Sequence, residues 1–160
     1  MIGLPDDFHT ESLYAPDCWY LHDLVELDRD AQRIVGWTDT TRLGALVDAQ
    51  QPWPGHPKHV PGAVAIQLTG TLGNLHAAYL LDLRPSQGWV GYGTHLRNAR
   101  FRKMGQIGPP MISHAVCTRH RNLRGTWFLD YSFTFEQDGE VLYESTQTAA
   151  WVRHPGASAD

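Results

Sequence analysis

The side chains best suited to chemistry lie in a Pro/Gly/His-rich stretch that leads into a long segment without charge. His56 and His59 precede Pro61, and residues 62–81 include no Asp, Glu, Lys or Arg. Imidazole has an ordinary pKa close to neutral pH, so either histidine could serve as a general base. Gln67, further along, can donate and accept hydrogen bonds but cannot exchange a proton at accessible pH. The stretch therefore offers few proton-transferring groups.

The uncharged segment itself predicts a buried helix. Pro61 suits the first turn of a helix, and the residue before Pro85 disfavours helix, so we expect the helix to end there. About 20 apolar residues can span a bilayer. Gln67, Asn74 and His76 would each be costly in hydrocarbon, however, so we expect burial inside a domain and no membrane partner.

The start of this helix is a candidate binding site for an oxygen atom. The backbone N–H groups near Gly62 and Ala63 have no partner within the helix, and the positive end of the helix dipole lies there. Such a turn suits the carbonyl oxygen of a substrate. We therefore include both residues among the predicted substrate-binding positions.

The rest of the chain predicts mostly strands. Residues 21–40 resemble a hairpin, residues 89–103 and 110–122 are rich in β-formers, and residues 126–153 are divided by Asp138-Gly139, a strong hairpin signal. Residues 6–20 favour a short helix or turn, and residues 41–51 are ambiguous between a helical turn and a loop. An early hairpin, one helix and four later strands argue against repeated βαβ units. They predict an α+β hotdog fold, an antiparallel sheet wrapped around a long central helix; a β-barrel with an incidental helix is the structural alternative.

Length and charge limit the partners. The chain has 160 residues and a formal net charge of −4, from 13 basic and 17 acidic residues. We expect a single domain over residues 1–160, with residues 1–13 and 154–160 flexible, and no nucleic-acid partner. Arg100, Arg102 and Lys103 form part of a local basic concentration, which is either a solvated strand face or a landing site for a phosphate or an acidic partner.

Cysteine and histidine spacing indicates neither a disulfide framework nor a metal site. Cys18 and Cys117 lie far apart, and the histidines on the strands have no ligand spacing. The acidic start of the sequence does not fit an export signal. We therefore predict a cytoplasmic protein without bound metal.

The stretch WPGHPKHVPGAVAIQ resembles the loop and helix entry of β-hydroxyacyl-ACP dehydratases, which read roughly G-H-F-P-G-x-P-x-x-P-G-V-x-x-x-E. Matching Pro61-Gly62 to the dehydratase P-G places the glutamate position on Gln67 and the histidine position near Pro52 or Trp53. Dehydration needs a base for the α-proton and an acid for the leaving hydroxyl. Because neither matched position has such a group, an ordinary dehydratase is disfavoured.

A closer resemblance is to the FcoT-type fatty acyl-CoA thioesterases, another hotdog family. Tyr14 with the CWYL of residues 18–21 is similar to that family's Y-x4-C-x-Y-L, HVPGAV is similar to its helix entry, and ARFRK and RGTWFL are similar to its later strands. The resemblance implies a site role for Tyr14. A second site tyrosine of that family falls on Trp53, and two asparagines fall near Gly62 and Thr71, with Asn74 close by.

A site with few carboxylates favours chemistry that needs little proton transfer. Hydrolysis would require His56 or His59 to activate water, whereas an amine is already nucleophilic and need only be oriented beside a polarised thioester. Some relatives of the FcoT type are amine-adding enzymes. The resemblance therefore implies conjugate addition of an amine such as glycine to a 2-enoyl thioester, giving a β-amino acyl product in a biosynthetic pathway.

Other functions remain open at this stage. The alternatives are an acyl-CoA or acyl-ACP thioesterase, a non-catalytic acyl-binding hotdog domain and, more weakly, a cyclase or isomerase. In each enzymatic case the substrate itself would carry coenzyme A or the phosphopantetheine of an acyl carrier protein, without another cofactor. Hotdog relatives dimerise with their sites at the subunit boundary, which implies a homodimer.

The predicted site combines groups for chemistry with groups for binding. The predicted catalytic residues are Tyr14, His56, His59 and Gln67, and the predicted substrate-binding residues are Trp53, Gly62, Ala63, Thr71, Asn74, Arg100, Arg102 and Lys103.

Overall fold

A computed structural model describes residues 1–154. Its main feature is a six-stranded sheet in which all neighbours are antiparallel, in the order β1-β2-β6-β7-β8-β4. The strands are β1 (Asp23–Asp28), β2 (Arg33–Thr38), β4 (Trp89–Phe101), β6 (Met111–Leu123), β7 (Thr126–Gln137) and β8 (Glu140–Arg153), and a second, two-stranded sheet pairs β3 (His59–Val60) with β5 (Gly105–Gln106).

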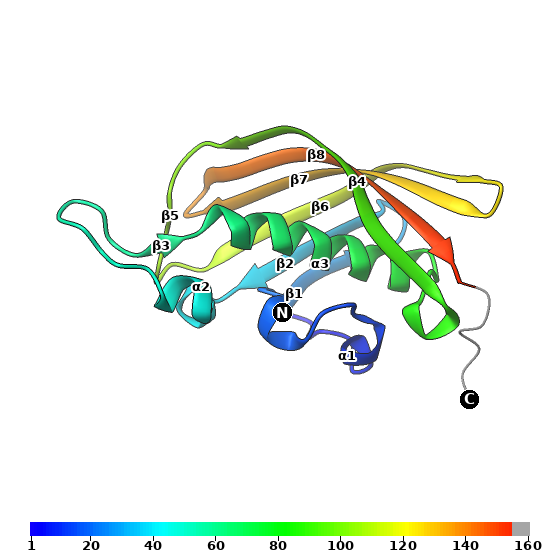
Figure 1. The fold of residues 1–160 in the computed structure, drawn as a ribbon, viewed down its shortest axis with the longest axis horizontal. Coiled ribbons are helices and arrows are strands. Elements are labelled where there is room, and N and C mark those ends of the chain that lie inside the picture. Colours follow the sequence, from blue (N-terminus) through cyan, green and yellow to red (C-terminus); the bar gives the residue numbers. More distant parts are fainter. Residues whose placement is uncertain (155–160) are drawn as a thin grey trace.

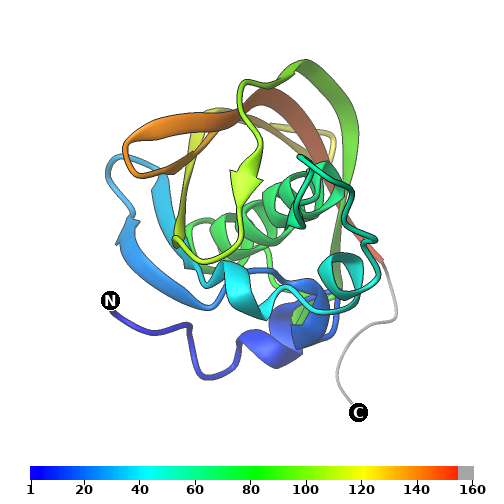
Figure 2. The same ribbon diagram turned by 90° about the vertical axis from the view of Figure 1, so that its left-hand side faces the viewer.

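The long helix α3 (Gly62–Leu80) lies across the concave face of the large sheet (Figure 1). Seen from its N-terminal end, the helix is enclosed by the curved strands (Figure 2). Leu68, Leu72 and Leu75 are fully buried on its sheet-facing side, where Phe133 and Phe135 of β7 also belong to the core. The hotdog arrangement predicted from the order of elements is confirmed.

Helix α3 ends before the position expected from Pro85. Asp82 adopts a positive φ of 58°, and the N–H of Leu83 donates to the carbonyl oxygen of Ala77 at 2.8 Å, which closes the helix as a left-handed cap. The guanidinium of Arg29 donates to the carbonyl oxygens of Tyr79 and Leu80 at 2.7 and 2.6 Å. A cation at this end satisfies carbonyl groups that the helix leaves free.

Both predicted hairpins are present. β1 and β2 pair through a short turn, and Asp138 and Gly139 join β7 to β8 with φ values of 50° and 77°. Two positive φ values suit the tight turn that Asp-Gly favours. The ambiguous residues 41–51 contain the end of the 3-10 helix η2 (Thr40–Arg42) and the short helix α2 (Ala45–Asp48).

The N-terminal segment packs below α3. It contains α1 (Phe8–Glu11) and the 3-10 helix η1 (Pro16–Cys18), and a third 3-10 helix, η3 (Pro85–Gln87), follows α3. Phe8 is buried with its ring 4.6 Å from that of Trp19, and Glu11 is also buried. Residues 1–13, predicted to be flexible, thus contribute buried side chains to the interior. Of residues 154–160, also predicted to be flexible, residues 155–160 lie outside the described residues. None of the helices within residues 1–154 is long and apolar enough to cross a membrane.

Candidate functional site

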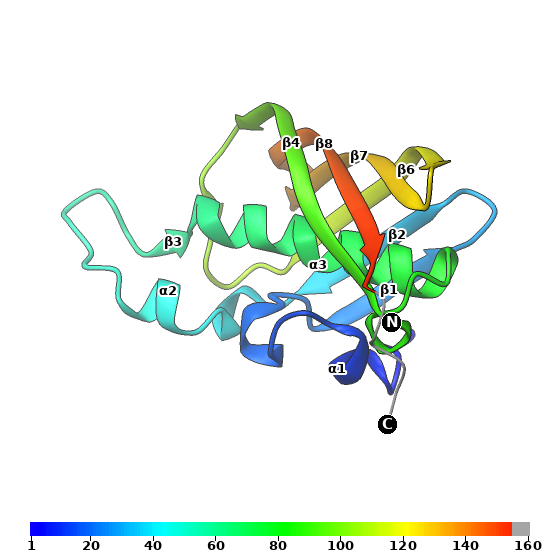
Figure 3. The same ribbon diagram turned by 45° about the vertical axis from the view of Figure 1, so that its right-hand side comes forward.

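A cavity of about 440 Å³ lies between α3 and the sheet. Its exposed rim includes Tyr14, Gly70, Tyr92 and Gly93. Figure 3 shows β4 and β8 crossing in front of α3, with the N-terminal segment below them. The other lining residues, most of them at least partly buried, are Ser12, Leu13, Gln67, Thr69, Thr71, Gly73, Asn74, Gly91, Tyr131, Phe133, Gln147, Thr148, Ala149 and Trp151.

Helix α3 presents three polar side chains to this cavity. Gln67, Thr71 and Asn74 follow an i, i+4, i+7 spacing, which places them on one helix face. Gln67 Nε2, Thr71 Oγ1 and Asn74 Oδ1 are buried atoms without a hydrogen-bond partner in the protein, as is Trp151 Nε1 from β8. The cavity wall therefore carries hydrogen-bonding capacity that the fold does not use.

Two glycines of β4 shape the opposite wall. A Cβ atom on Gly91 would lie 2.4 Å from the indole of Trp151, so only glycine lets that ring lie flat against the strand. A Cβ atom on Gly93 would meet nothing within 4 Å. Glycines inside a strand often mark a close approach of another group. Here Gly91 makes room for Trp151, and Gly93 borders open space.

Hydrogen bonds connect Tyr131, in the cavity lining, to His76 and the partly buried Gln32. Gln32 Nε2 donates to the carbonyl oxygen of Arg29 at 2.6 Å, so its Oε1 faces His76 Nε2 at 3.1 Å. His76 must then carry its proton on Nε2, and its Nδ1 accepts from the Tyr131 hydroxyl at 3.0 Å. His76 is thus a core histidine whose two ring nitrogens both have partners.

Burial is the main cause of the pKa shifts of His76 and Tyr131. It lowers the pKa of His76 to about 4, with a further lowering from the nearby charge of His120. It also raises the pKa of the Tyr131 phenol well above its ordinary value. Both groups are therefore neutral at pH 7. The hydrogen bonds among Tyr131, His76 and Gln32 thus support the structure and carry no charge.

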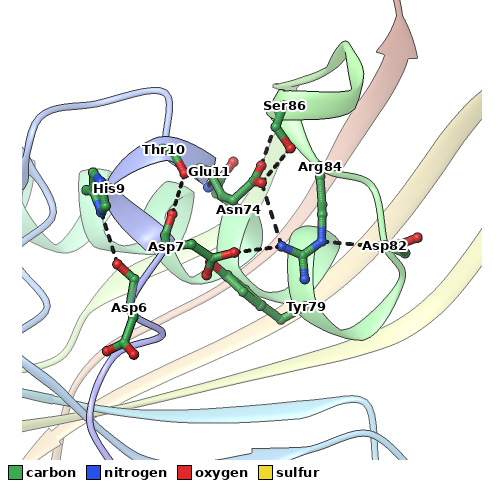
Figure 4. A network of polar contacts seen from close by, with 10 residues as sticks. All are labelled: Asp6, Asp7, His9, Thr10, Glu11, Asn74, Tyr79, Asp82, Arg84 and Ser86. Carbon is green, nitrogen blue, oxygen red and sulfur yellow. Dashed lines mark hydrogen bonds and ion pairs between the residues drawn. The ribbon is translucent and has the colours of Figure 1, made fainter. Parts of the chain in front are cut away.

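A polar network fixes the N-terminal segment beside the cavity (Figure 4). Asn74 Nδ2 donates to the carbonyl oxygen of Glu11 at 2.6 Å. The Glu11 carboxylate accepts from the Ser86 hydroxyl at 2.5 Å and from its N–H at 3.1 Å, and lies 3.6 Å from Arg84. This network holds the chain just before residues 12–14, which form one cavity wall.

Arg84 and Tyr79 extend the network toward Asp7. The Arg84 guanidinium pairs with Asp7 at 3.0 Å and with Asp82 at 3.1 Å, and the Tyr79 hydroxyl donates to Asp7 at 2.7 Å. The hydrogen bond from Tyr79 is the main cause that lowers the pKa of Asp7. Burial, followed by the bond to the Asp7 carboxylate, raises the pKa of Tyr79.

We expect Glu11→Ala to release the cavity wall. The buried carboxylate accepts two hydrogen bonds, so its loss should cost about 2 kcal/mol of unfolding free energy. Amide hydrogen exchange of residues 12–14 should accelerate together with the loss of stability. Asp82→Asn is the matched control, because it weakens an exposed pair with the same Arg84 and should change little. Equal effects of the two substitutions would contradict this account of the network.

Four of the predicted site residues line the cavity: Tyr14, Gln67, Thr71 and Asn74. Tyr14 is 57% exposed at the rim, and its carbonyl oxygen accepts from Trp19 Nε1 at 2.7 Å. Residues separated by more than fifty positions in the sequence are thus brought together by the docking of the N-terminal segment on α3.

The predicted residues before and at the start of α3 lie outside this cavity lining. Trp53 and His56 face each other across a turn in the loop between α2 and β3, which extends from the end of the molecule where α3 begins (Figures 1 and 3). The rings of His56 and His59 are 5.0 Å apart. Gly62 borders a separate pocket of about 20 Å³, beside Phe101, and Ala63 is exposed.

The predicted basic residues lie at the far end of β4 and just beyond it. Arg102 pairs with Glu144 at 2.5 Å, Arg100 lies 3.9 Å from the same carboxylate, and Lys103 pairs with Glu140. Lys103 also borders the small pocket near Gly62. Their charges are therefore partly balanced within the protein, and none of them lines the main cavity.

Sequence reasoning missed the sheet side of the site. Tyr131 and Phe133 come from β7 and Trp151 comes from β8, both in the predicted hairpin of residues 126–153. The alternation of large residues at every second position of β7 is the signal that places Tyr131 and Phe133 against the helix. The spacing of Gly91 and Gly93 was a second unused signal, since strand glycines mark close approach.

The lining is chemically neutral. Among the cavity residues of the described chain, the polar groups are amides, hydroxyls, phenols and one indole, without carboxylate, imidazole, thiol or amine. Residues 1–154 also contain no group of three or more His, Cys, Asp or Glu side chains arranged to hold a metal ion. The site can therefore bind and polarise through hydrogen bonds, while a strong base would have to come from elsewhere.

An antiparallel sheet wrapped around one long helix, with a cavity between them, defines this chain as a hotdog-fold protein. Solved structures similar to it include the dehydratase heterocomplex ApeI:P from Xenorhabdus doucetiae, with a TM-score of 0.68, 14% identity and coverage of 97% of this chain and 94% of that chain. No protein-family model matches the sequence, and no curated protein matches it.

Two thioesterase structures are also similar. A hypothetical thioesterase with coenzyme A from Streptococcus pneumoniae has a TM-score of 0.58 and 15% identity, covering 94% of this chain and 98% of that chain. A thioesterase from Haemophilus influenzae has a TM-score of 0.55 and 15% identity, covering 82% and 78%. At these identities the similarity establishes the fold.

Proposed function

We propose that this protein is an enzyme that acts on acyl or enoyl thioesters in the cavity between α3 and the sheet. The cavity is large enough for a small acyl group and its thioester. The similar structures, two of thioesterases and one of a dehydratase heterocomplex, support a thioester substrate, and one of them was solved with coenzyme A. The thioester would be carried by coenzyme A or by an acyl carrier protein.

The proposed reaction is conjugate addition of an amine, such as glycine with its carboxylate at the exposed rim, to a 2-enoyl thioester. The observation that carries this proposal is the neutral lining of the cavity. Hydrolysis and dehydration both require a group that removes a proton from water or from carbon. An amine in its free-base form needs only orientation and a polarised acceptor, which amides and hydroxyls can provide.

Gln67 and Thr71 have the groups needed to polarise the thioester. Gln67 Nε2 and the Thr71 hydroxyl would donate to the carbonyl oxygen, since both atoms are buried at the cavity and unpaired in the protein. The amine lone pair forms the bond to the β-carbon, and the electron pair of the double bond moves toward the carbonyl as an enolate. The proton lost from nitrogen ends on the α-carbon. The Tyr14 hydroxyl at the rim is the proposed carrier of that proton.

A thioesterase is the second candidate, favoured by the names of two similar structures. It would need water to be activated by His56, in the loop before β3, or by His59, at the start of β3; neither lines the cavity of its own chain. A non-catalytic acyl-binding protein is the third candidate and is also compatible with a neutral cavity. The three candidates differ in the products that they predict.

Mass spectrometry of a 2-enoyl carrier protein incubated with the enzyme and a panel of amines separates these candidates. Conjugate addition predicts a mass gain equal to one amine, and hydrolysis predicts loss of the acyl group. Parallel incubations with 2-enoyl coenzyme A identify the carrier. Binding without any change in mass would leave the non-catalytic candidate, and absence of both turnover and binding would refute a role on thioesters.

We further propose a homodimer formed along β4. This strand is at the edge of the sheet, and Tyr92, Leu96 and Phe101 on it are exposed, as is Ile66 on the adjoining side of α3. A long exposed edge with apolar side chains favours pairing with another chain. Such pairing would bring a second copy close to the cavity rim.

Leu96→Glu should shift a dimer toward monomer, as measured by light scattering coupled to size-exclusion chromatography, because it places a charge at the proposed interface. Leu123→Glu is the matched control: Leu123 is similarly exposed, but lies at the end of β6 in another part of the sheet. A monomeric wild-type protein at micromolar concentration would contradict the proposed dimer.

A further inference from the structure

The inner part of the cavity contains more unused hydrogen-bonding groups than a thioester alone requires. Asn74 Oδ1 and Trp151 Nε1 remain after Gln67 and Thr71 have been assigned to the carbonyl. Thr71, Asn74 and Trp151 are each at least nine-tenths buried. Buried polar atoms almost always have a partner, and an unpaired one costs about 1–3 kcal/mol. Two further orphan groups at one cavity therefore indicate a ligand that pairs with them.

The hydrogen-bonding direction of both groups is fixed. The indole nitrogen of Trp151 can only donate. Asn74 Nδ2 already donates to the carbonyl oxygen of Glu11 at 2.6 Å, which leaves Oδ1 as the unpaired acceptor. The complementary ligand must offer an acceptor to Trp151 and a donor to Asn74.

The same ligand group must be uncharged. The cavity lining of the described chain has no cationic side chain to balance a carboxylate and no anionic side chain to balance an ammonium group. Transfer of an unbalanced charge into such a site would be costly. A hydroxyl or a carboxamide satisfies all three conditions, because each is neutral and each both donates and accepts.

The helix sets the position of this group. Thr71 and Asn74 are three residues apart, a rise of about 4.5 Å along α3. A carbonyl bound at Thr71 and a polar group bound at Asn74 would therefore be separated by only a few bonds. We propose that the acyl group of the substrate is short and bears a neutral hydroxyl or carboxamide near its β-carbon, bound by Asn74 and Trp151. This inference rests on the proposed thioester function and names the substrate class for that site.

Inert substrate analogues test the inference apart from turnover. In pantetheine amides, nitrogen replaces the thioester sulfur, so binding can be measured by calorimetry without reaction. The 4-hydroxybutanoyl amide, whose hydroxyl is on the carbon next to the β-carbon, should bind about tenfold more tightly than the butanoyl amide, and also more tightly than the octanoyl amide. Equal or tighter binding of the two unsubstituted chains would overturn the inference, even if thioesters are consumed.

Variants assign the preference to particular atoms. Trp151→Phe removes the indole N–H and should reduce the tenfold preference to about twofold or less, whereas Thr71→Val should weaken the hydroxylated and the plain butanoyl analogue equally. Tyr143→Phe is the control, because its buried hydroxyl is also unpaired but borders the small pocket; it should leave the preference unchanged. A preference that persists in a folded Trp151→Phe protein would overturn the assignment to Trp151.

A measurement on the unmodified protein covers the case in which Trp151→Phe does not fold. The indole N–H resonance of Trp151 should move downfield when the hydroxylated analogue is added and should respond less to the butanoyl analogue. An identical response to both analogues would overturn the inference. A clear preference for the hydroxylated analogue, with no thioester consumed in the mass-spectrometric assay, would instead refute only the proposed catalysis.

Discussion

Gln67→Leu should lower the kcat for thioester turnover by about 10²–10³-fold, the range found when one donor to a developing oxyanion is removed. Gln67 Nε2 is buried at the cavity and has no partner in the protein, so it is available to the substrate carbonyl. For the same reason the substitution should change the free energy of unfolding little. A steady-state assay together with thermal unfolding separates the two effects.

Gln67→Glu tests whether the donor, rather than the shape of the side chain, is responsible. A carboxylate has nearly the same size but only accepts hydrogen bonds when ionised, and it would repel an enolate. We therefore expect addition by Gln67→Glu to be no faster than by Gln67→Leu. Retention of more than about half of the wild-type kcat in both variants would show that the carbonyl is bound elsewhere.

The second large effect concerns the stability of the protein in acid. Burial holds the folded-state pKa of His76 at about 4, whereas the unfolded chain titrates near 6.5. Below pH 6.5 the unfolded state therefore binds a proton that the folded state does not, and the stability falls as the pH is lowered from about 6.5 to about 4. The loss from this residue should amount to roughly 3 kcal/mol.

His76→Asn should flatten this pH dependence, because asparagine does not titrate in that range. Chemical unfolding between pH 4 and pH 7.5 measures the slope. The half-buried His22, whose pKa burial also lowers, should leave a smaller residual slope in the variant. His120→Asn is the control, since this side chain is exposed on β6 and its replacement should leave most of the slope intact. An unchanged slope in His76→Asn would contradict the assignment.

The order of elements was predictable because local signals determine it. The signals are the proline positions, the uncharged run of residues 62–81 and Asp138-Gly139, and each lies within one short segment of the sequence. Together they predicted the helix, the hairpins and the hotdog arrangement. Helix α3 ends earlier than predicted because Asp82 adopts a positive φ, which forms a left-handed cap that proline-based reasoning does not reveal.

The site was only partly predictable because it depends on which surfaces meet. Tyr14 and Gln67 were selected by resemblance or by residue type, and the fold brings both to the cavity. The histidines before α3 had the most reactive side chains, but reactivity alone could not place His56 or His59, which lie outside the cavity lining of their own chain. Trp151 was missed because its role depends on Gly91, its register partner on the neighbouring strand β4.

The contact between Glu11 and Ser86 joins residues 75 positions apart in the sequence. Ser86 directly follows α3, and Asn74 of the same helix donates to the carbonyl oxygen of Glu11, so the N-terminal segment docks on a surface that α3 must first provide. The chain could thus complete its sheet and helix before the N-terminal segment docks. A nascent or partly opened molecule would then be compact yet inactive, so that the last step of folding also switches on the site.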